Sequence, residues 1–145
     1  MLQGLLLGLE TKAVRDYGFE FEEAFVSDAK ARGLTACRIP GVGAFDAVVN
    51  GYRVQCKRKE FTDRGNVRIA KGQHRYRRGE WDVLALLFRD TLYLIPEPLL
   101  CINGETLRTT IMPWRYDAYR DAWGIFDNEA PAGAEPVEHQ ATLFG

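Results

Sequence analysis

The chain has 145 residues, which suits one domain with a hydrophobic core of its own and requires neither a disulfide nor a metal ion for folding. Hydrophobic residues make up 46% and charged residues 27%, the composition of an ordinary soluble globular protein. Its three cysteines, Cys37, Cys56 and Cys101, form no CxxC pair, which argues against a disulfide framework or a zinc site and favours reduced thiols in a cytoplasmic protein.

The net charge of −1 conceals an uneven distribution along the chain. Residues 51–80 contain ten Lys or Arg and three acidic residues, a net charge of +7, so the rest of the chain carries −8. A basic block in an otherwise acidic chain is a candidate surface for a polyanion. The alternative is a solvated surface face, and charge alone favours neither.

The first expected elements are helical. Residues 1–10 combine a short apolar run with no cationic start and no cleavage site, so we expect no signal peptide and no membrane span, but a short amphipathic helix packed on the core or on a second subunit. Residues 18–32 carry apolar side chains at helical spacing, among them Phe21 and Phe25, and Gly33 follows where a C-cap belongs. A second amphipathic helix is therefore expected there.

A short strand over residues 34–39 leads to a hairpin with the turn Asn50-Gly51, the dipeptide typical of a two-residue type I′ turn. Residues 60–80 are polar and basic, and we expect a loop followed by a helix through residues 71–79. The remaining expected elements are strands at 83–88 and 91–96, the first buried on both faces, and a helix around 114–123.

This order of helix, three strands, helix and strands predicts an α/β fold. We place the domain at residues 1–127. From residue 128 the chain is rich in Ala, Pro and Glu and nearly free of large apolar side chains, so residues 128–145 are expected to form a disordered linker that ends in a short peptide motif.

The hairpin brings three polar side chains together. Pairing counted outward from the turn places Asp46 opposite Gln55, with Cβ atoms roughly 5 Å apart. The alternation of side chains along a strand adds Lys57 to the same face. The opposite face is expected to be a core surface made of Phe45, Ala47, Val49, Tyr52, Val54 and Cys56.

An acid, an amide and a lysine above a rigid strand pair suit the hydrolysis of a phosphodiester bond. The Asp46 carboxylate, the Gln55 side-chain carbonyl and the Cys56 backbone carbonyl would be oxygen ligands for Mg²⁺, with Mn²⁺ as a substitute. The metal would activate a water molecule, and Lys57 would orient the nucleophile or stabilise the developing negative charge. The alternative is that the three side chains simply bond to one another on an exposed strand face.

Asp46, then Gln55-Cys56-Lys57 on the paired strand, after a helix that carries Glu22, resembles the motif of the PD-(D/E)XK nuclease superfamily. The helix opening, residues 18–22, resembles the GxxxE motif of archaeal-type Holliday junction resolvases. The resemblance implies a restriction-endonuclease-like core, with a mixed sheet of about four to five strands flanked by helices in the order αβββαβ. It also implies a DNA endonuclease, and a homodimer because a junction or a duplex needs two cuts.

The family pattern implies that Glu22 joins the site from the helix, often through a metal-bound water, and Glu20 and Glu23 compete for that role. One departure concerns Gln55, which stands where the family usually has Glu. Gln keeps an oxygen ligand and removes a charge, so metal affinity should fall or a second metal site should be lost. The same QxK variant resembles a homing endonuclease branch, which makes sequence-specific cleavage the first alternative and a non-catalytic DNA-binding module the second.

Basic residues around this motif would contact phosphates on either side of the cleaved bond. His74 could act as a base or phosphate ligand, although a surface role is the commoner one for a lone His. The expected DNA-binding residues are Arg38, Arg58, Lys59, Arg64, Arg68, Lys71, Arg75, Arg77 and Arg78.

The last residues, QATLF at 140–144, resemble the pentapeptide with which bacterial polymerases and repair proteins bind the sliding clamp. Gln140, Leu143 and Phe144 would make that contact, and a flexible leader would raise the local concentration of a nuclease at DNA. The alternative is that Leu143 and Phe144 fold back onto the core.

Overall fold

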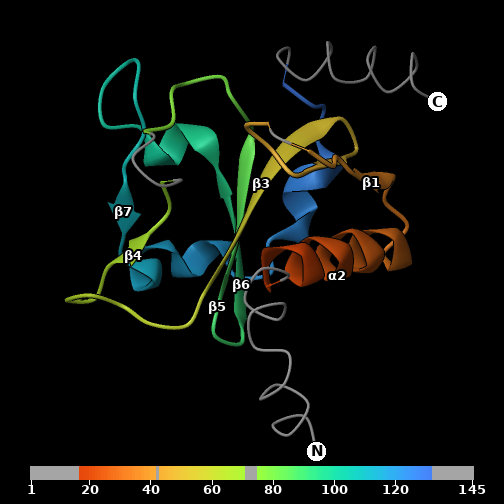
Figure 1. The fold of residues 1–145 in the computed structure, drawn as a ribbon. Coiled ribbons are helices and arrows are strands. Elements are labelled where there is room, and N and C mark those ends of the chain that lie inside the picture. The colour runs from red at the N-terminus through yellow and green to blue at the C-terminus, as the bar shows by residue number, and fades with distance from the viewer. Residues whose placement is uncertain (1–16, 42, 71–74, 132–145) are drawn as a thin grey trace, which may run out of the picture.

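The structure, a computed structural model, describes residues 17–41, 43–70 and 75–131. A five-stranded sheet in the order β1-β2-β3-β5-β6 forms its centre, and α2 packs on one face of it (Figure 1). The strands of this sheet are β1 (Ala36–Arg38), β2 (Ala47–Val49), β3 (Tyr52–Lys59), β5 (Val83–Phe88) and β6 (Thr91–Pro96). The other elements are α2 (Tyr17–Ala31), the two-stranded sheet of β4 (Val67–Arg68) and β7 (Thr110–Ile111), and the 3₁₀-helices η1 (Glu97–Leu100), η2 (Pro113–Tyr119) and η3 (Trp123–Asp127).

The sheet is mixed, because β3 and β5 run parallel while every other neighbouring pair is antiparallel. The expected α/β class with a mixed sheet of four to five strands is therefore confirmed. A parallel pair requires a crossover connection. Here the crossover spans residues 60–82 and contains β4.

Helix α2 supplies one core layer. Phe21, Phe25 and Ala29 lie on its buried face, against the side of the sheet that carries Val54. The ring of Trp123 in η3 stacks on Phe25 with centroids 5.2 Å apart. The helix ends where the sequence predicts, since the chain turns at Gly33 with a φ of 86°, a left-handed conformation that glycine adopts without strain.

Strand β5 is buried on both faces, as its continuous apolar run predicts. Val83 and Ala85 point into the layer under α2. Leu84 and Leu86 point into a second layer on the opposite face. That second layer also contains Val67, Ile69, Tyr76, Trp81, Leu100, Leu107 and Ile111.

The hairpin has the predicted register, with Ala47 opposite Val54 and Val49 opposite Tyr52. Asn50 and Gly51 both have positive φ, 48° and 84°, as a type I′ turn requires. The core face differs from the prediction in one residue. Phe45 precedes β2 and packs in the second layer, so it does not share the layer under α2 with the other five.

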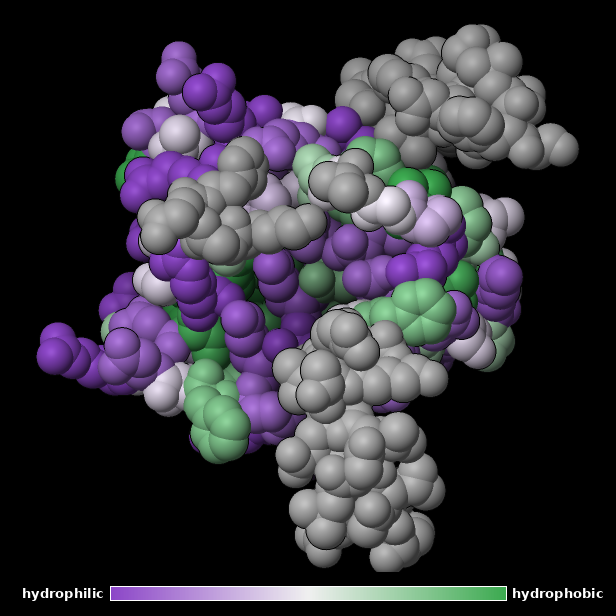
Figure 2. Space-filling model, in the orientation of Figure 1, coloured by the Kyte–Doolittle hydropathy of each residue, from purple (hydrophilic) through white to green (hydrophobic). Residues whose placement is uncertain are grey.

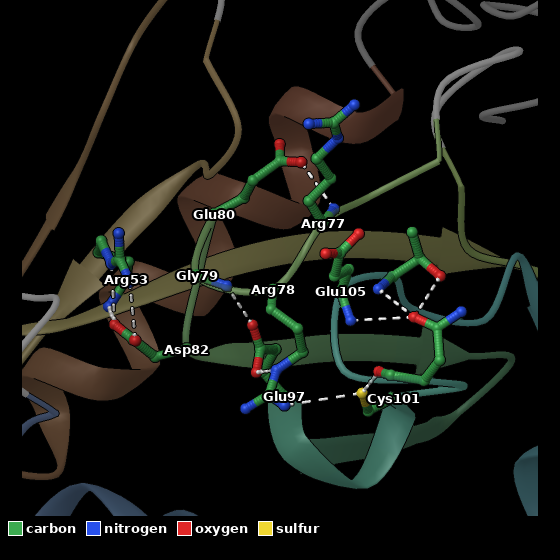
Figure 3. A network of polar contacts seen from close by, with 11 residues as sticks. Arg53, Arg77, Arg78, Gly79, Glu80, Asp82, Glu97, Cys101 and Glu105 are labelled. Carbon is green, nitrogen blue, oxygen red and sulfur yellow. Dashed lines mark hydrogen bonds and ion pairs between the residues drawn. The ribbon is translucent and has the colours of Figure 1, made fainter.

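The helix expected through residues 71–79 is absent from the part that the structure describes, residues 75–79, which form an extended segment and a turn. The buried carboxylate of Glu97 accounts for the turn, because it accepts hydrogen bonds from Arg78 Nε at 2.7 Å and from the backbone N–H of Gly79 at 2.6 Å (Figure 3). Arg77 forms a β-bridge with Thr106. A helix would remove these contacts and leave a buried carboxylate without its donors.

The last helix, expected around residues 114–123, is replaced by η2 and η3. Asp121 has a φ of 48° between them, which ends any continuous helix. The break allows Trp123 to stack in the core while Trp114 stays 61% exposed.

Several expectations fall outside the described residues: the helix at 1–10, the basic and polar residues 71–74, and the clamp motif with Gln140, Leu143 and Phe144. Of the expected linker, residues 128–131 are described, and Glu129 O accepts a hydrogen bond of 3.0 Å from the Tyr52 hydroxyl. Among the residues that the structure describes, no helix combines the length and the apolar character needed to cross a bilayer.

Asn50 also ties the hairpin to the rest of the domain. Its Oδ1 accepts hydrogen bonds of 2.9 Å from Thr35 N and Oγ1, and its Nδ2 donates to Phe126 O at 3.0 Å.

We expect Asn50→Gly, which keeps the turn and loses these bonds, to lower the free energy of unfolding by about 1–3 kcal/mol in urea titrations. Asn50→Ala should cost about 1 kcal/mol more because of its positive φ. As a matched control, Asn66→Gly removes one long bond, from Nδ2 to Arg64 O at 3.4 Å, and losses equal to those of Asn50→Gly would contradict the assignment.

Candidate active site at the open edge of strand β3

Strand β3 is longer than its partner β2, and the difference in length creates an open edge. β2 pairs with residues 52–54 alone, whereas β5 pairs with residues 54–59. Over residues 55–59 the described strands therefore flank β3 on one side only. Asp46, the residue before β2, lies beside this edge, because its N–H donates to Val54 O at 2.8 Å and its carbonyl accepts from Ile39 N at 2.8 Å.

Three groups meet at this edge. Asp46 Oδ2 accepts hydrogen bonds from Cys56 N at 2.9 Å and from Gln55 Nε2 at 3.0 Å. Gln55 Nε2 also lies 3.3 Å from Cys56 O. The neighbouring positions of Asp46 and Gln55 follow from the predicted register. The orientation of the amide does not, because Gln55 turns its NH₂ group, and not its carbonyl, towards the two oxygens.

Gln55 is 5% exposed, and Lys57 is half-buried two residues further along the same face of β3. Val54 and Cys56 alternate with these residues along β3 and point to the opposite face of the strand, into the core layer under α2. The site is therefore supported by packed core side chains. It is this packing that keeps the strand edge rigid, which a catalytic or binding constellation needs.

Glu22 comes to the site from α2. Its side chain is 16% exposed, and Oε1 accepts a hydrogen bond of 2.9 Å from Arg38 Nε in β1. The Arg38 guanidinium in turn lies 4.0 Å from the centroid of the Phe19 ring. Glu20 and Glu23, the competing acids of the same helix, are exposed. Arg38, expected at the DNA surface, therefore also positions Glu22.

Both carboxylates act electrostatically on the Cys56 thiol. Burial raises the pKa of this thiol well above its usual range, and the negative charges of Asp46 and Glu22 raise it further. Asp46 and Glu22 thus approach the same strand residue from different elements. Within the described parts of the chain, no three His, Cys, Asp or Glu side chains are grouped closely enough to hold a metal ion. The oxygen donors at the edge are these two carboxylates, the Gln55 amide and the Cys56 carbonyl.

Tyr76 was missed by the sequence analysis. It is 2% exposed, packs edge to face on Trp81, and has a raised pKa because of burial and then the charge of Asp46. The charge of Asp46 therefore acts on a buried phenol that the crossover supplies. The available signal was an aromatic residue within a run of basic ones, which a helix prediction for residues 71–79 obscured.

The predicted DNA-binding residues differ in their surroundings. Arg58 and Lys59 are half-buried at the end of β3, and Arg58 Nε lies 3.6 Å from Glu60 Oε1. Arg78 is exposed and pairs with the buried carboxylate of Glu97 (Figure 3). The surface drawn in Figure 2 is mostly hydrophilic over the described residues, with smaller apolar patches, some of them in hollows between polar side chains. The exposed members of the predicted set are Arg64, Arg68, Arg75, Arg77 and Arg78, whereas Lys71 lies outside the described residues.

The fold and this strand edge together define an α/β domain with an acid, an amide and a lysine beside a strand segment that, among the described strands, has a neighbour on one side only. Among solved structures, the chain is similar to a bacterial homing endonuclease, I-Ssp6803I, with a TM-score of 0.53 and 20% sequence identity over 74% of this chain and 86% of that one. The likeness establishes a shared fold. No protein-family model matches the chain, and no curated protein matches it either.

The environment of Cys56 can be tested with thiol reagents. Since a raised pKa leaves less thiolate at a given pH, we expect Cys56 in the folded protein to react at pH 8 more than about tenfold more slowly than Cys37, which is exposed. Mass spectrometry of peptides labelled over time measures both rates. Denatured protein, in which the thiols should react alike, is the control. Equal rates in the folded protein would contradict the buried position.

Proposed function

We propose that this protein is a metal-dependent DNA endonuclease whose active site is the open edge of β3. The observation that carries the proposal is the Asp46 carboxylate, held by Cys56 N at 2.9 Å and Gln55 Nε2 at 3.0 Å at the edge of β3 that β2 does not cover. Lys57 lies on the same face. The fold shared with a bacterial homing endonuclease supports the same class of activity.

The donors at the edge fit Mg²⁺, which prefers carboxylate and carbonyl oxygens. Asp46 and Cys56 O would hold the ion directly, and Glu22 would do so through water. Gln55 would join them after its amide rotates by half a turn, since the NH₂ group that now contacts both oxygens and its own Oε1 are nearly alike in shape. When bound, Mg²⁺ would supply the Lewis acid that activates a water molecule and neutralises charge on the phosphate.

The chain's own side chains would do the rest. The Lys57 ammonium would orient the attacking water or offset the negative charge that develops on the phosphate oxygens. The ion pair with Arg38 would hold the Glu22 carboxylate in a fixed position. Basic residues from β3 and the crossover would hold phosphates of the DNA backbone on either side of the cut.

Two kinds of substrate compete. The sequence motifs at residues 18–22 favour four-way junctions, whereas the QxK variant and the shared fold favour a homing-type enzyme that cuts duplex DNA at a preferred sequence. We take duplex cleavage as the main proposal and junction resolution as the second. Either reaction needs two cuts, which makes a homodimer part of the proposal. A non-catalytic DNA-binding module and clamp binding through residues 140–144 remain predictions.

Lys57→Ala and Asp46→Ala separate an enzyme from a binding module. We expect each to lower the rate of Mg²⁺-dependent DNA cleavage by about 10²–10³-fold or more, because each removes a group that stabilises charge in the transition state. Binding measured in Ca²⁺ should be retained. Lys30→Ala, at an exposed position in the last turn of α2, is the matched control and should cleave normally.

The substrates for this assay are a linear duplex, a four-way junction and a single strand. Preferential cleavage of the duplex at few positions supports the homing-type proposal, and preferential cleavage of the junction supports the second one. If the wild-type protein cleaves none of them in Mg²⁺ or Mn²⁺, the enzyme proposal is wrong.

Gln55→Glu tests the metal site without an activity assay. In the absence of metal the variant should lose about 1–3 kcal/mol of stability, because a third carboxylate replaces the donor that links Asp46 to Cys56 O. Added Mg²⁺ should raise its melting temperature more than that of the wild type, because the new ligand is charged. Combining it with Asp46→Asn should remove the response. Equal Mg²⁺ responses in wild type and Gln55→Glu would rule out Gln55 as a ligand.

A further inference from the structure

A second feature lies on the same sheet face as Lys57, beyond the end of β3. A cavity of about 360 Å³ opens there, within the usual size range of ligand pockets. Phe88, Arg89, Tyr93, Trp114 and Arg120 are among its lining residues. Phe88 is the register partner of Lys59, and its side chain belongs to the second core layer. The cavity therefore continues the face that carries Gln55, Lys57 and Lys59.

The cavity lies a short way from the proposed reaction centre. Lys59 is two residues beyond Lys57, and β-strands rise about 3.3 Å per residue, so the two positions are roughly 7 Å apart along the strand. Successive nucleotides in one DNA strand are about 3.4 Å apart along the helix axis. A strand whose cleaved phosphate is near Lys57 would thus bring a nucleotide about two steps away to the level of Phe88.

The charge of the cavity suits a nucleotide. The described residues that line it include two arginines and no acid. Arg89 Nε donates to Glu60 O at 3.0 Å, and its guanidinium lies 4.9 Å from the centroid of the Phe88 ring. Arg120 Nε donates to Asp117 Oδ1 at 3.1 Å. Both guanidinium groups are thereby held at the cavity, and a guanidinium has further N–H donors for a phosphate.

The aromatic side chains suit a base. Trp114 is 61% exposed, and the Arg115 guanidinium lies 5.3 Å from its ring centroid. Phe61, next to the lining residue Thr62, is 84% exposed. Exposed aromatic rings beside arginines form stacking platforms for unpaired bases, and stacking tolerates every base because each has a flat face. Surface that is aromatic and cationic is thus complementary to an unpaired nucleotide rather than to a paired duplex.

We propose that this cavity binds an unpaired nucleotide of the DNA substrate, with its base stacked on Trp114 and its phosphate held by Arg89 and Arg120. The inference rests on the proposed function and narrows the range of DNA substrates. The cleaved strand is unpaired close to the cut, either because the DNA is branched or because a base is flipped out of a duplex.

Tryptophan fluorescence tests the stacking directly. The chain has three tryptophans, and Trp81 and Trp123 are 1% and 7% exposed, so a ligand that stacks on an exposed ring quenches Trp114 alone. In EDTA, where no cleavage occurs, an oligo(dT) single strand should quench the emission of the full-length protein. Trp114→Ala should abolish the quenching and weaken binding of oligo(dT) about 10-fold, within the range for loss of one stacked base.

Three DNAs then distinguish the sources of the unpaired base: oligo(dT), a duplex with a one-nucleotide bulge, and a fully paired duplex. Loss of affinity in Trp114→Ala for the first two supports recognition of bases that are already unpaired, and an equal loss for the paired duplex supports base flipping. Leu99→Ala, which removes a 45% exposed apolar side chain of η1, is the control and should bind all three normally. Circular dichroism and melting curves verify that both variants fold.

The two proposals fail in different ways. If the wild-type protein binds the DNAs and Trp114→Ala binds each of them as tightly, the proposal of a nucleotide-binding cavity is wrong. The endonuclease proposal then still stands. Wild-type protein that binds none of the three overturns both.

Discussion

The proposed site depends on the unequal pairing of strand β3, which has neighbours on both sides at its start and a single strand neighbour from residue 55 onwards among the described residues. Where β2 has not yet begun, the carboxylate of Asp46 takes the place of a strand partner and accepts the N–H of Cys56 at 2.9 Å. One side chain thus satisfies a backbone donor, and the edge stays open for a ligand. A longer β2 would cover this edge with backbone hydrogen bonds and remove the site.

Gln55 keeps this edge of β3 stable in the absence of metal. Asp46 and Glu22 already place two negative charges near the Cys56 thiol, where they help to raise its pKa. Arg38 offsets the charge of Glu22, and the Gln55 NH₂ group lies between Asp46 and Cys56 O much as a cation would. A glutamate at residue 55 would bind metal more strongly and repel its neighbours without it. The neutral amide of Gln55 therefore lowers the affinity for the metal ion and also lowers the cost of charge repulsion when no metal ion is bound.

Ion pairs to the buried carboxylates of Asp82 and Glu97 shape the crossover that completes the second layer. Arg53 binds the Asp82 carboxylate through Nε and Nη2 at 3.1 and 3.0 Å, and Arg78 binds Glu97 at 2.7 Å (Figure 3). These pairs hold the chain on either side of Trp81, which lies in the core. Two arginines of a basic segment therefore serve the fold, while the cationic residues near Trp114 face the open cavity.

The local sequence determined the elements that form through interactions between residues close together in the chain. The Asn50-Gly51 turn determined the register, and therefore the contact between Asp46 and Gln55, while continuous apolar runs determined the strands at 83–88 and 91–96 with the bounds later observed. Tertiary structure decided what depends on distant partners. The turn at residues 78–79 exists because Glu97 is buried 18 residues further on, and no helix spans 114–123 because Trp123 packs on Phe25. Hydrogen-bond donors and ring contacts supplied from far along the chain leave no periodic pattern, so the helix expected at residues 71–79 obscured Tyr76, and no pattern indicated the cavity near Trp114.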